Sequence, residues 1–239
     1  MNIIDVIIIL LMGISIVTGY HKGILQQAVM FAGTILVYVS AFFLKNPVAD
    51  LFFKYAPFFK FAGDIKGIVV LNVIIYQLIA FILVAGILFS IFGIVVKTTG
   101  ILQKAVDMTV ILTIPSKIGG AIVGFFEGYI ILFLLLTVLI IPLSSIGLGE
   151  SVLANKIIYE SPLLTKSLGG IGDAIHDIFT LVGEGYDEGI AVNQMNLDTM
   201  DALLKYNVIK PESAQLLIDN NKLESVQGIQ EIVNKYKGE

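Results

Sequence analysis

The feature that most constrains the fold is a run of apolar residues at 118–141, interrupted by one charge, Glu127. A helix rises about 1.5 Å per residue, so a run of this length crosses the roughly 30 Å apolar core of a bilayer. Further apolar runs lie at 3–19, 24–44 and 67–96. Together the four runs predict an all-α integral membrane protein with four transmembrane helices in contact with lipid.

Composition agrees with a membrane chain and excludes several other classes. Of the 239 residues, 56% are hydrophobic and only 14% are charged, whereas a soluble domain carries about 25% charged residues. The chain has no cysteine, which excludes disulfides and thiolate metal sites. It has no arginine and therefore no bidentate phosphate fork, which argues against nucleic-acid binding.

Charge and hydropathy divide the chain into three parts. Residues 1–150 form the predicted four-span membrane domain, with an interfacial amphipathic helix at 97–113 before the fourth span. A polar segment at 45–66, where lysines mix with phenylalanines, is expected to lie as a loop or short helix at the headgroup level. Residues 151–197 are predicted to form an amphipathic helical segment, and residues 198–239 an acidic tail of three short helices.

Glycines recur at regular spacing in two of the spans. Gly120, Gly124 and Gly128 repeat every four residues, and a helix turns about 100° per residue, so they share one stripe. A stripe of this kind lets two membrane helices approach backbone to backbone, either within the chain or in a homo-oligomer. A second stripe on the third span is the predicted partner, and pore lining is the alternative function; this second stripe comprises Gly86, Gly93 and Gly100.

Polar residues inside the spans are the other candidate sites. Glu127 borders the glycine stripe. It either faces a cavity, a substrate or a proton path, or it lies near the headgroups, where it is paired with Lys117 or solvated. Asp5 is expected to cap the first helix, and the negative early charge argues that this run is no cleaved signal peptide. Asn72 and Gln77 are expected to form hydrogen bonds between helices.

No catalytic or metal-binding pattern stands out. His176 lies beside Asp173 and Asp177 at helical spacing, but a solvated helix face explains this group better than a metal site. The glycines at 119–128 open a membrane helix and not a βα turn, so they are no phosphate loop. We therefore expect no enzyme activity, no cofactor and no metal.

Taken in order, the motifs resemble those of the colicin V production protein (CvpA) family. They are the opening Asn2-Ile3-Ile4-Asp5, the turn Gly19-Tyr20-His21-Lys22-Gly23, the segment Val96-Lys97-Thr98-Thr99-Gly100, and Gly119-Gly120-Ala121-Ile122-Val123-Gly124-Phe125-Phe126-Glu127-Gly128. The resemblance covers roughly residues 1–170. The family tends to place a basic residue just before the last glycine of the fourth-span motif, where this chain has Glu127. A role assigned to that basic residue therefore does not transfer to this chain.

The resemblance implies a function as well as a fold. Members are similar to one another as small four-span proteins of the bacterial cytoplasmic membrane, linked to toxin (colicin V) production and to envelope homeostasis. We accordingly expect a non-enzymatic, oligomeric membrane protein that supports toxin production or export, with a possible envelope or export partner and both termini outside. The alternative is a small oligomeric channel or transporter whose conduit is lined by the glycine-rich fourth span.

Overall fold

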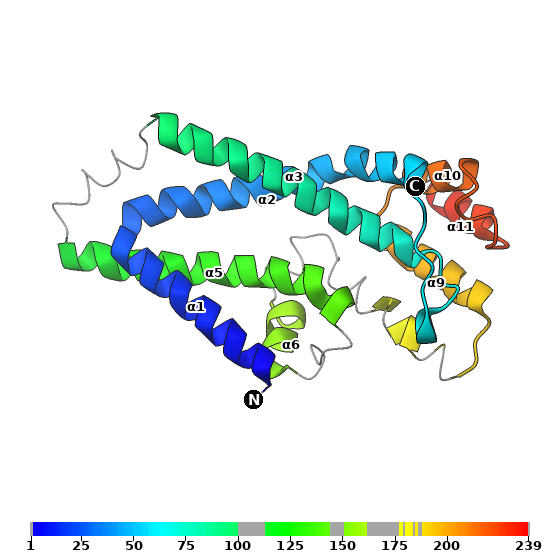
Figure 1. The fold of residues 1–239 in the computed structure, drawn as a ribbon, viewed down its shortest axis with the longest axis horizontal. Coiled ribbons are helices and arrows are strands. Elements are labelled where there is room, and N and C mark those ends of the chain that lie inside the picture. The colour runs from blue at the N-terminus through cyan, green and yellow to red at the C-terminus, as the bar shows by residue number, and fades with distance from the viewer. Residues whose placement is uncertain are drawn as a thin grey trace. The chain divides into compact units, whose positions relative to one another are not determined.

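The structure is a computed structural model that describes residues 2–99, 113–143, 151–161, 177–178, 180–183, 185 and 188–238. Its named elements within these ranges are all helical (Figure 1). They are α1 (Ile3–Lys22), α2 (Ile24–Tyr55), the short 3-10 helix η1 (Gly63–Ile65), α3 (Leu71–Thr99), α5 (Thr113–Leu143), α6 (Val152–Tyr159), α9 (Val192–Lys205), α10 (Pro211–Asp219) and α11 (Ile229–Tyr236).

Four of the described helices, α1, α2, α3 and α5, are long and apolar enough to cross a membrane. Large apolar side chains point outward from them: Ile14 of α1 is 62% exposed and Leu36 of α2 is 64% exposed. Extended apolar surface of this kind on long helices is typical of contact with lipid. The predicted all-helical membrane fold with four spans is therefore confirmed.

The second helix extends well beyond its predicted end at residue 44. α2 runs without a break through Lys45 and Pro47 to Tyr55, so the separate loop or short helix expected from Lys45 onward does not begin there. Proline removes one backbone hydrogen bond but leaves the rest of a membrane helix intact, and neighbouring groups compensate for the loss. The irregular segment begins only after Tyr55.

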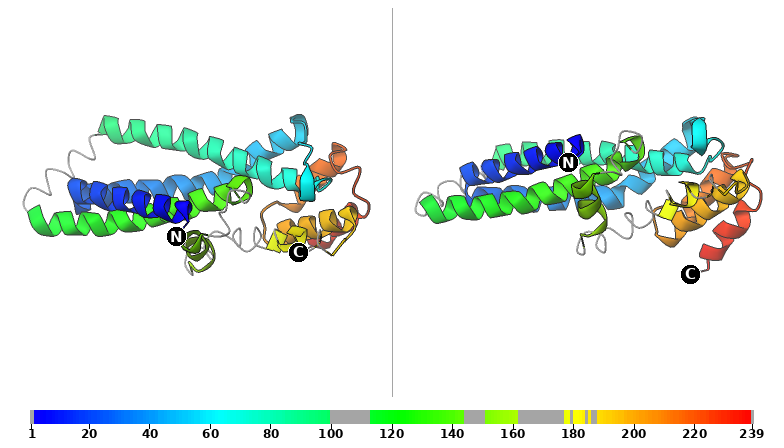
Figure 2. Two further views of the ribbon diagram at one scale, coloured as in Figure 1. Left: turned by 60° about the horizontal axis from the view of Figure 1, so that its bottom comes forward. Right: turned by 90° about the horizontal axis from the view of Figure 1, so that it is seen from below.

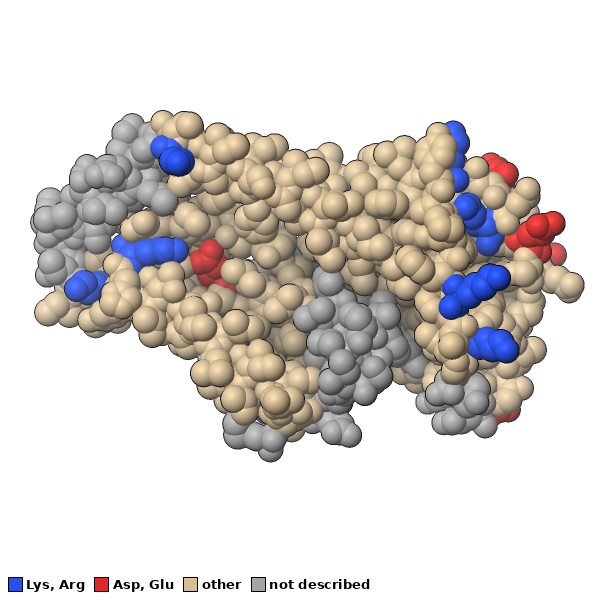
Figure 3. All heavy atoms as spheres, viewed as in Figure 1, with Lys and Arg blue, Asp and Glu red and all other residues tan. Residues whose placement is uncertain are grey.

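The chain divides into two compact units. The first unit comprises Met1–Phe42 and Ala85–Leu164, and the second comprises Phe43–Val84 and Thr165–Glu239. The division passes through α2 and α3, so each of these helices continues from one unit into the other. Charged side chains are sparse over the membrane helices in the face shown in Figure 3 and more numerous around the tail helices.

In the first unit α1 runs along α5, as both views of Figure 2 show. The first part of α2 packs on the last part of α3. There the ring of Phe92 lies directly on Gly33, and the rings of Tyr38 and Phe89 meet edge to face at 5.2 Å.

In the second unit α9, α10 and α11 form a small helical cluster. Its core consists of apolar side chains with no exposed surface, including Met200, Leu203, Leu217 and Val233. The predicted interfacial helix at 97–113 and much of the predicted helical segment at 151–197 lie outside the described residues.

Candidate functional site

The glycine stripe of α5 forms the interface with α1. A β-carbon on Gly120 would collide with the carbonyl oxygen of Gly19, and one on Gly124 would lie 2.5 Å from the carbonyl oxygen of Ser15. A β-carbon on Gly128 would lie 2.6 Å from the hydroxyl oxygen of the same Ser15. Gly120 and Gly124 therefore hold α5 backbone to backbone against α1, and Gly128 packs on the Ser15 side chain.

The predicted pairing of this stripe with the third span was wrong. Gly86 and Gly93 of α3 have open space where a β-carbon would lie, and Gly100 is outside the described residues. Helical periodicity shows which face of a helix carries small residues, but it does not show which neighbour packs on that face. The partner is α1, whose own small residues, Ser15 and Gly19, are also four positions apart.

The turn between α1 and α2 completes the α1–α5 contact. Gly23 has a φ of +77°, a conformation that side chains disfavour, and its N–H donates to the carbonyl of Gly19 at 3.0 Å. Ser116 of α5 is buried, and its hydroxyl accepts the N–H of Ile24 at 3.2 Å. Lys22, the basic residue of the turn, lies in the last turn of α1. The structure thus joins the turn motif to the start of α5, and nothing in the sequence around Ser116 indicates this connection.

Glu127 faces α2. Its carboxylate accepts hydrogen bonds from the amide nitrogen of Gln27 and, at 2.9 Å, from the hydroxyl of Thr34. Gln27 and Thr34 are seven residues apart and so share one face of α2, and both side chains are buried. Lys117, the nearest lysine on α5, instead has its ammonium 5.7 Å from the centre of the Tyr20 ring. The cluster of Glu127, Gln27 and Thr34, named here the carboxylate cluster, is the main polar site of the first unit.

Asp5 is buried and connects two helix starts. One carboxylate oxygen accepts the backbone N–H of Asn2 at 3.0 Å, which caps α1. The other accepts the hydroxyl of Ser151 at 2.6 Å and the N–H of Leu153 at 3.1 Å, both at the start of α6. The structure therefore adds a second task to the capping predicted for Asp5, because the residue also holds α6.

The polar residues of α3 differ in their partners. Asn72 forms hydrogen bonds with the backbone of Phe59, accepting its N–H at 2.7 Å and donating to its carbonyl at 3.2 Å. Phe59 lies in a loop, so these bonds do not join two helices as expected. Gln77 does form a hydrogen bond between helices, because its amide oxygen accepts one from the ammonium of Lys45 of α2 at 2.6 Å. Lys45 is only 5% exposed, whereas the sequence suggested an ammonium in water.

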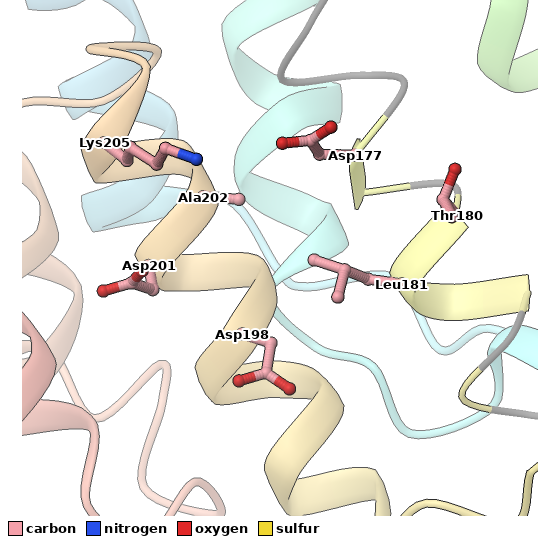
Figure 4. Close-up of a pocket in the computed structure, with 7 residues that line it drawn as sticks. All are labelled: Asp177, Thr180, Leu181, Asp198, Asp201, Ala202 and Lys205. Carbon is pink, nitrogen blue, oxygen red and sulfur yellow. The ribbon is translucent and has the colours of Figure 1, made fainter.

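A pocket of about 400 Å³ lies in the second unit between residues 177–181 and α9 (Figure 4). Its lining includes the carboxylates of Asp177, Asp198 and Asp201 and the side chain of Lys205. Asp177 accepts the hydroxyl of Tyr206, and this hydrogen bond raises the pKa of the phenol. The other two members of the candidate metal group, Asp173 and His176, lie outside the described residues.

Four apolar helices packed around a few buried polar groups define a multi-pass membrane protein. The chain matches the family described as "Colicin V production protein" over residues 4–162, and it belongs to that family. It is also 29% identical over 176 residues to the "Uncharacterized transmembrane protein YshB" of Bacillus subtilis (strain 168), covering 69% of this chain and 94% of that protein. No solved structure matches the chain.

Proposed function

We propose that this protein is a non-enzymatic membrane scaffold that supports production or export of a colicin V-type toxin and the homeostasis of the cell envelope. The observation that carries the proposal is the family match, which extends over residues 4–162 and so includes most of α1 and all of α2, α3, α5 and α6. The family description names colicin V production.

The packing of α5 supports a scaffold over a conduit. A channel of the kind considered as the alternative would need Gly120, Gly124 and Gly128 on its wall. All three instead contact α1 so closely that a methyl group would not fit. Glycines in such contacts fix two helices together, which suits a protein that presents a defined surface to others.

The test of this proposal is genetic. In a toxin-producing host, the gene is deleted and then restored as wild type or as Gly120→Leu, with protein level checked by immunoblot. We expect the deletion to reduce exported toxin and to raise sensitivity to detergent, wild type to restore both, and the variant to fail. Full toxin export and normal detergent resistance in the deletion strain would refute the proposed role.

The carboxylate cluster favours the second candidate, a small channel or transporter. A carboxylate in a membrane-spanning helix is costly and is often found on an ion path. The measurement is current across planar bilayers that contain the purified full chain. Currents whose cation selectivity changes in Glu127→Gln would favour the channel, and silent bilayers would favour the scaffold.

The proposal also includes self-association of the chain, an envelope or export partner protein, and both termini outside. Since α1 occupies the glycines of α5, we propose that copies associate through another surface, and Gly86 and Gly93 of α3 are open. Crosslinking in native membranes, followed by mass spectrometry, identifies both a second copy and any export partner. A C-terminal reporter active only in the cytoplasm would contradict outside termini.

A further inference from the structure

The carboxylate cluster contains a negative charge whose hydrogen-bond partners are neutral. Glu127 accepts one bond from an amide and one from a hydroxyl, and neither group carries a positive charge. A carboxylate within a membrane helix is expensive unless a positive charge or a proton neutralises it. The cluster therefore provides the carboxylate with hydrogen bonds but does not neutralise its charge.

A second observation within the same cluster points to a ligand. The amide oxygen of Gln27 is buried and accepts no hydrogen bond from the described residues, and the whole side chain is only 2% exposed. A buried acceptor without a donor costs free energy, so an orphan of this kind in a native site calls for an explanation. What this oxygen lacks is an electropositive partner.

The oxygens in the cluster match a hard cation of single charge. They are the carboxylate of Glu127, the amide oxygen of Gln27 and the hydroxyl of Thr34. Carboxylate, carbonyl and hydroxyl oxygens suit hard cations, and sites for divalent ions generally use several carboxylates. One carboxylate balances one positive charge.

We propose that Glu127, Gln27 and Thr34 form a binding site for a monovalent cation, either a proton or an alkali-metal ion, within the membrane-spanning helices. An alkali-metal ion would be held by the carboxylate, the hydroxyl oxygen of Thr34 and, once the amide turns over, the amide oxygen of Gln27. A proton taken from water would sit on the carboxylate, whose O–H then donates to the amide oxygen of Gln27 after the amide turns over. The site goes beyond the scaffold role, because it makes the α2–α5 contact respond to ions.

Among the described residues, a tyrosine of α2 is a titratable group near the carboxylate. This residue, Tyr38, lies close enough to Glu127 for an electrostatic interaction between the two groups. From α1, the side chains nearest to the neighbouring Gly128 are Ser15 and Met12, and neither of them titrates. Binding of a cation is therefore assigned to Glu127 itself.

The test uses the purified full chain in nanodiscs of uncharged lipid. Thermal unfolding is measured in sodium, potassium and choline chloride at equal ionic strength, and then over a pH series in choline chloride. We expect sodium, potassium or a higher proton concentration to raise the midpoint temperature of wild-type unfolding relative to the other conditions. Glu127→Gln should remove this response, and the control Glu160→Gln, which changes an exposed acid of the same unit, should keep it.

Thr34→Val provides the second variant, in case Glu127→Gln does not fold. Loss of the hydroxyl removes a donor that stabilises the ionised carboxylate. For a proton, loss of this donor should make binding about tenfold tighter. For an alkali-metal ion, loss of a ligand should instead weaken binding by about tenfold.

The alkali-metal and pH series separate the two possible ligands. Identical wild-type midpoints in all three salts and across the pH series would overturn the proposal. A response that persists in Glu127→Gln, or that is unchanged in Thr34→Val, would also overturn it. Loss of toxin export, by contrast, tests the scaffold role and leaves this site unaffected.

Discussion

Gly19 and Gly120 face each other across the α1–α5 interface, and a β-carbon on either would collide with the carbonyl oxygen of the other. The contact is reciprocal and involves backbone on both sides. A flexible side chain could turn away from an added methyl group, but a helix backbone can relieve the collision only by moving the whole helix. The spacing between α1 and α5 is therefore set at this pair.

Replacing Gly120 by alanine is expected to destabilise the protein. Overpacking of a tight contact costs about 1–3 kcal/mol, which exceeds the gain of about 1 kcal/mol in helix propensity from glycine to alanine. The measurement is the thermal unfolding of the full chain in detergent, followed by circular dichroism. We expect a lower midpoint for Gly120→Ala than for wild type.

Gly93→Ala is the matched control, because it places the same methyl group on α3 where no heavy atom lies within 4 Å. Only the propensity gain remains, so this variant should be neutral or more stable by up to about 1 kcal/mol. Equal destabilisation by both substitutions would contradict the role of the Gly19–Gly120 contact.

Asp5 and Ser151 are expected to be energetically coupled. Asp5→Ala removes the cap of α1 and leaves the Ser151 hydroxyl and the Leu153 N–H without their acceptor, so we expect a loss of about 1–3 kcal/mol. Ser151→Ala should cost less, since Asp5 keeps its other two donors. The double variant should cost less than the sum of the single variants.

The control for this cycle is Asp219→Ala, which removes an exposed carboxylate that accepts only a surface amide, that of Gln215, at 2.8 Å. Its effect should stay within about 0.5 kcal/mol. Strict additivity of Asp5→Ala and Ser151→Ala in detergent unfolding would show that the two side chains act independently.

The number and approximate positions of the spans could be predicted from the sequence because hydropathy is a local property. Runs of apolar residues long enough for a bilayer must be helical, since every backbone group must be satisfied inside lipid. The end of α2 could not be predicted in the same way. Lys45 and Pro47 have the local signature of a helix end, and only the acceptor on Gln77 of α3 shows that the lysine lies inside the protein.

The candidate site was only partly visible in the sequence. Glu127 is conspicuous as the one charge in an apolar run, but its partners on α2 depend on which helix lies beside it. The seven-residue spacing of Gln27 and Thr34 places two polar groups on one face of α2 and was the available signal for this contact. Which face of α5 meets α1 is a tertiary property, and for this reason the glycine partner was assigned to the wrong helix.

Gln77→Leu is expected to destabilise the protein more than Lys45→Met. The first change removes the acceptor 2.6 Å from a buried ammonium, and losing a hydrogen bond to a charged group costs about 1.5–3 kcal/mol. The second change removes the charge itself and replaces it with an apolar side chain of similar length. Combining both should restore part of the stability lost in Gln77→Leu, as measured by detergent unfolding.

Lys54→Met serves as the control for the lysine series, because Lys54 is an exposed lysine of the same helix. It should change stability by less than about 0.5 kcal/mol. If the Lys45→Met and Gln77→Leu combination were less stable than Gln77→Leu alone, the ammonium would not be the source of the cost.

Asn196 is expected to hold the tail helices to the loop before α3. Its side chain is 2% exposed, accepts the N–H of Val70 at 3.1 Å, and donates to the carbonyl of Gly67 at 3.0 Å. Asn196→Ala leaves the N–H of Val70, a buried residue, without this acceptor, at a cost of about 1–3 kcal/mol. The tail should then exchange amide hydrogens and be cut by protease faster than in wild type.

Asn234→Ala is the matched control, since Asn234 is exposed and accepts one bond from Gln230 at 3.0 Å. Its amide exchange over 192–219 should match wild type. Comparison of the two variants distinguishes loss of a specific contact from general weakening of the tail. The Asn196 variant should also speed amide exchange at Ile68 and Val70, which lie outside the tail helices. Faster exchange in the tail with unchanged exchange at those two residues would mean that Asn196 stabilises α9 alone and that the loop is held by other contacts.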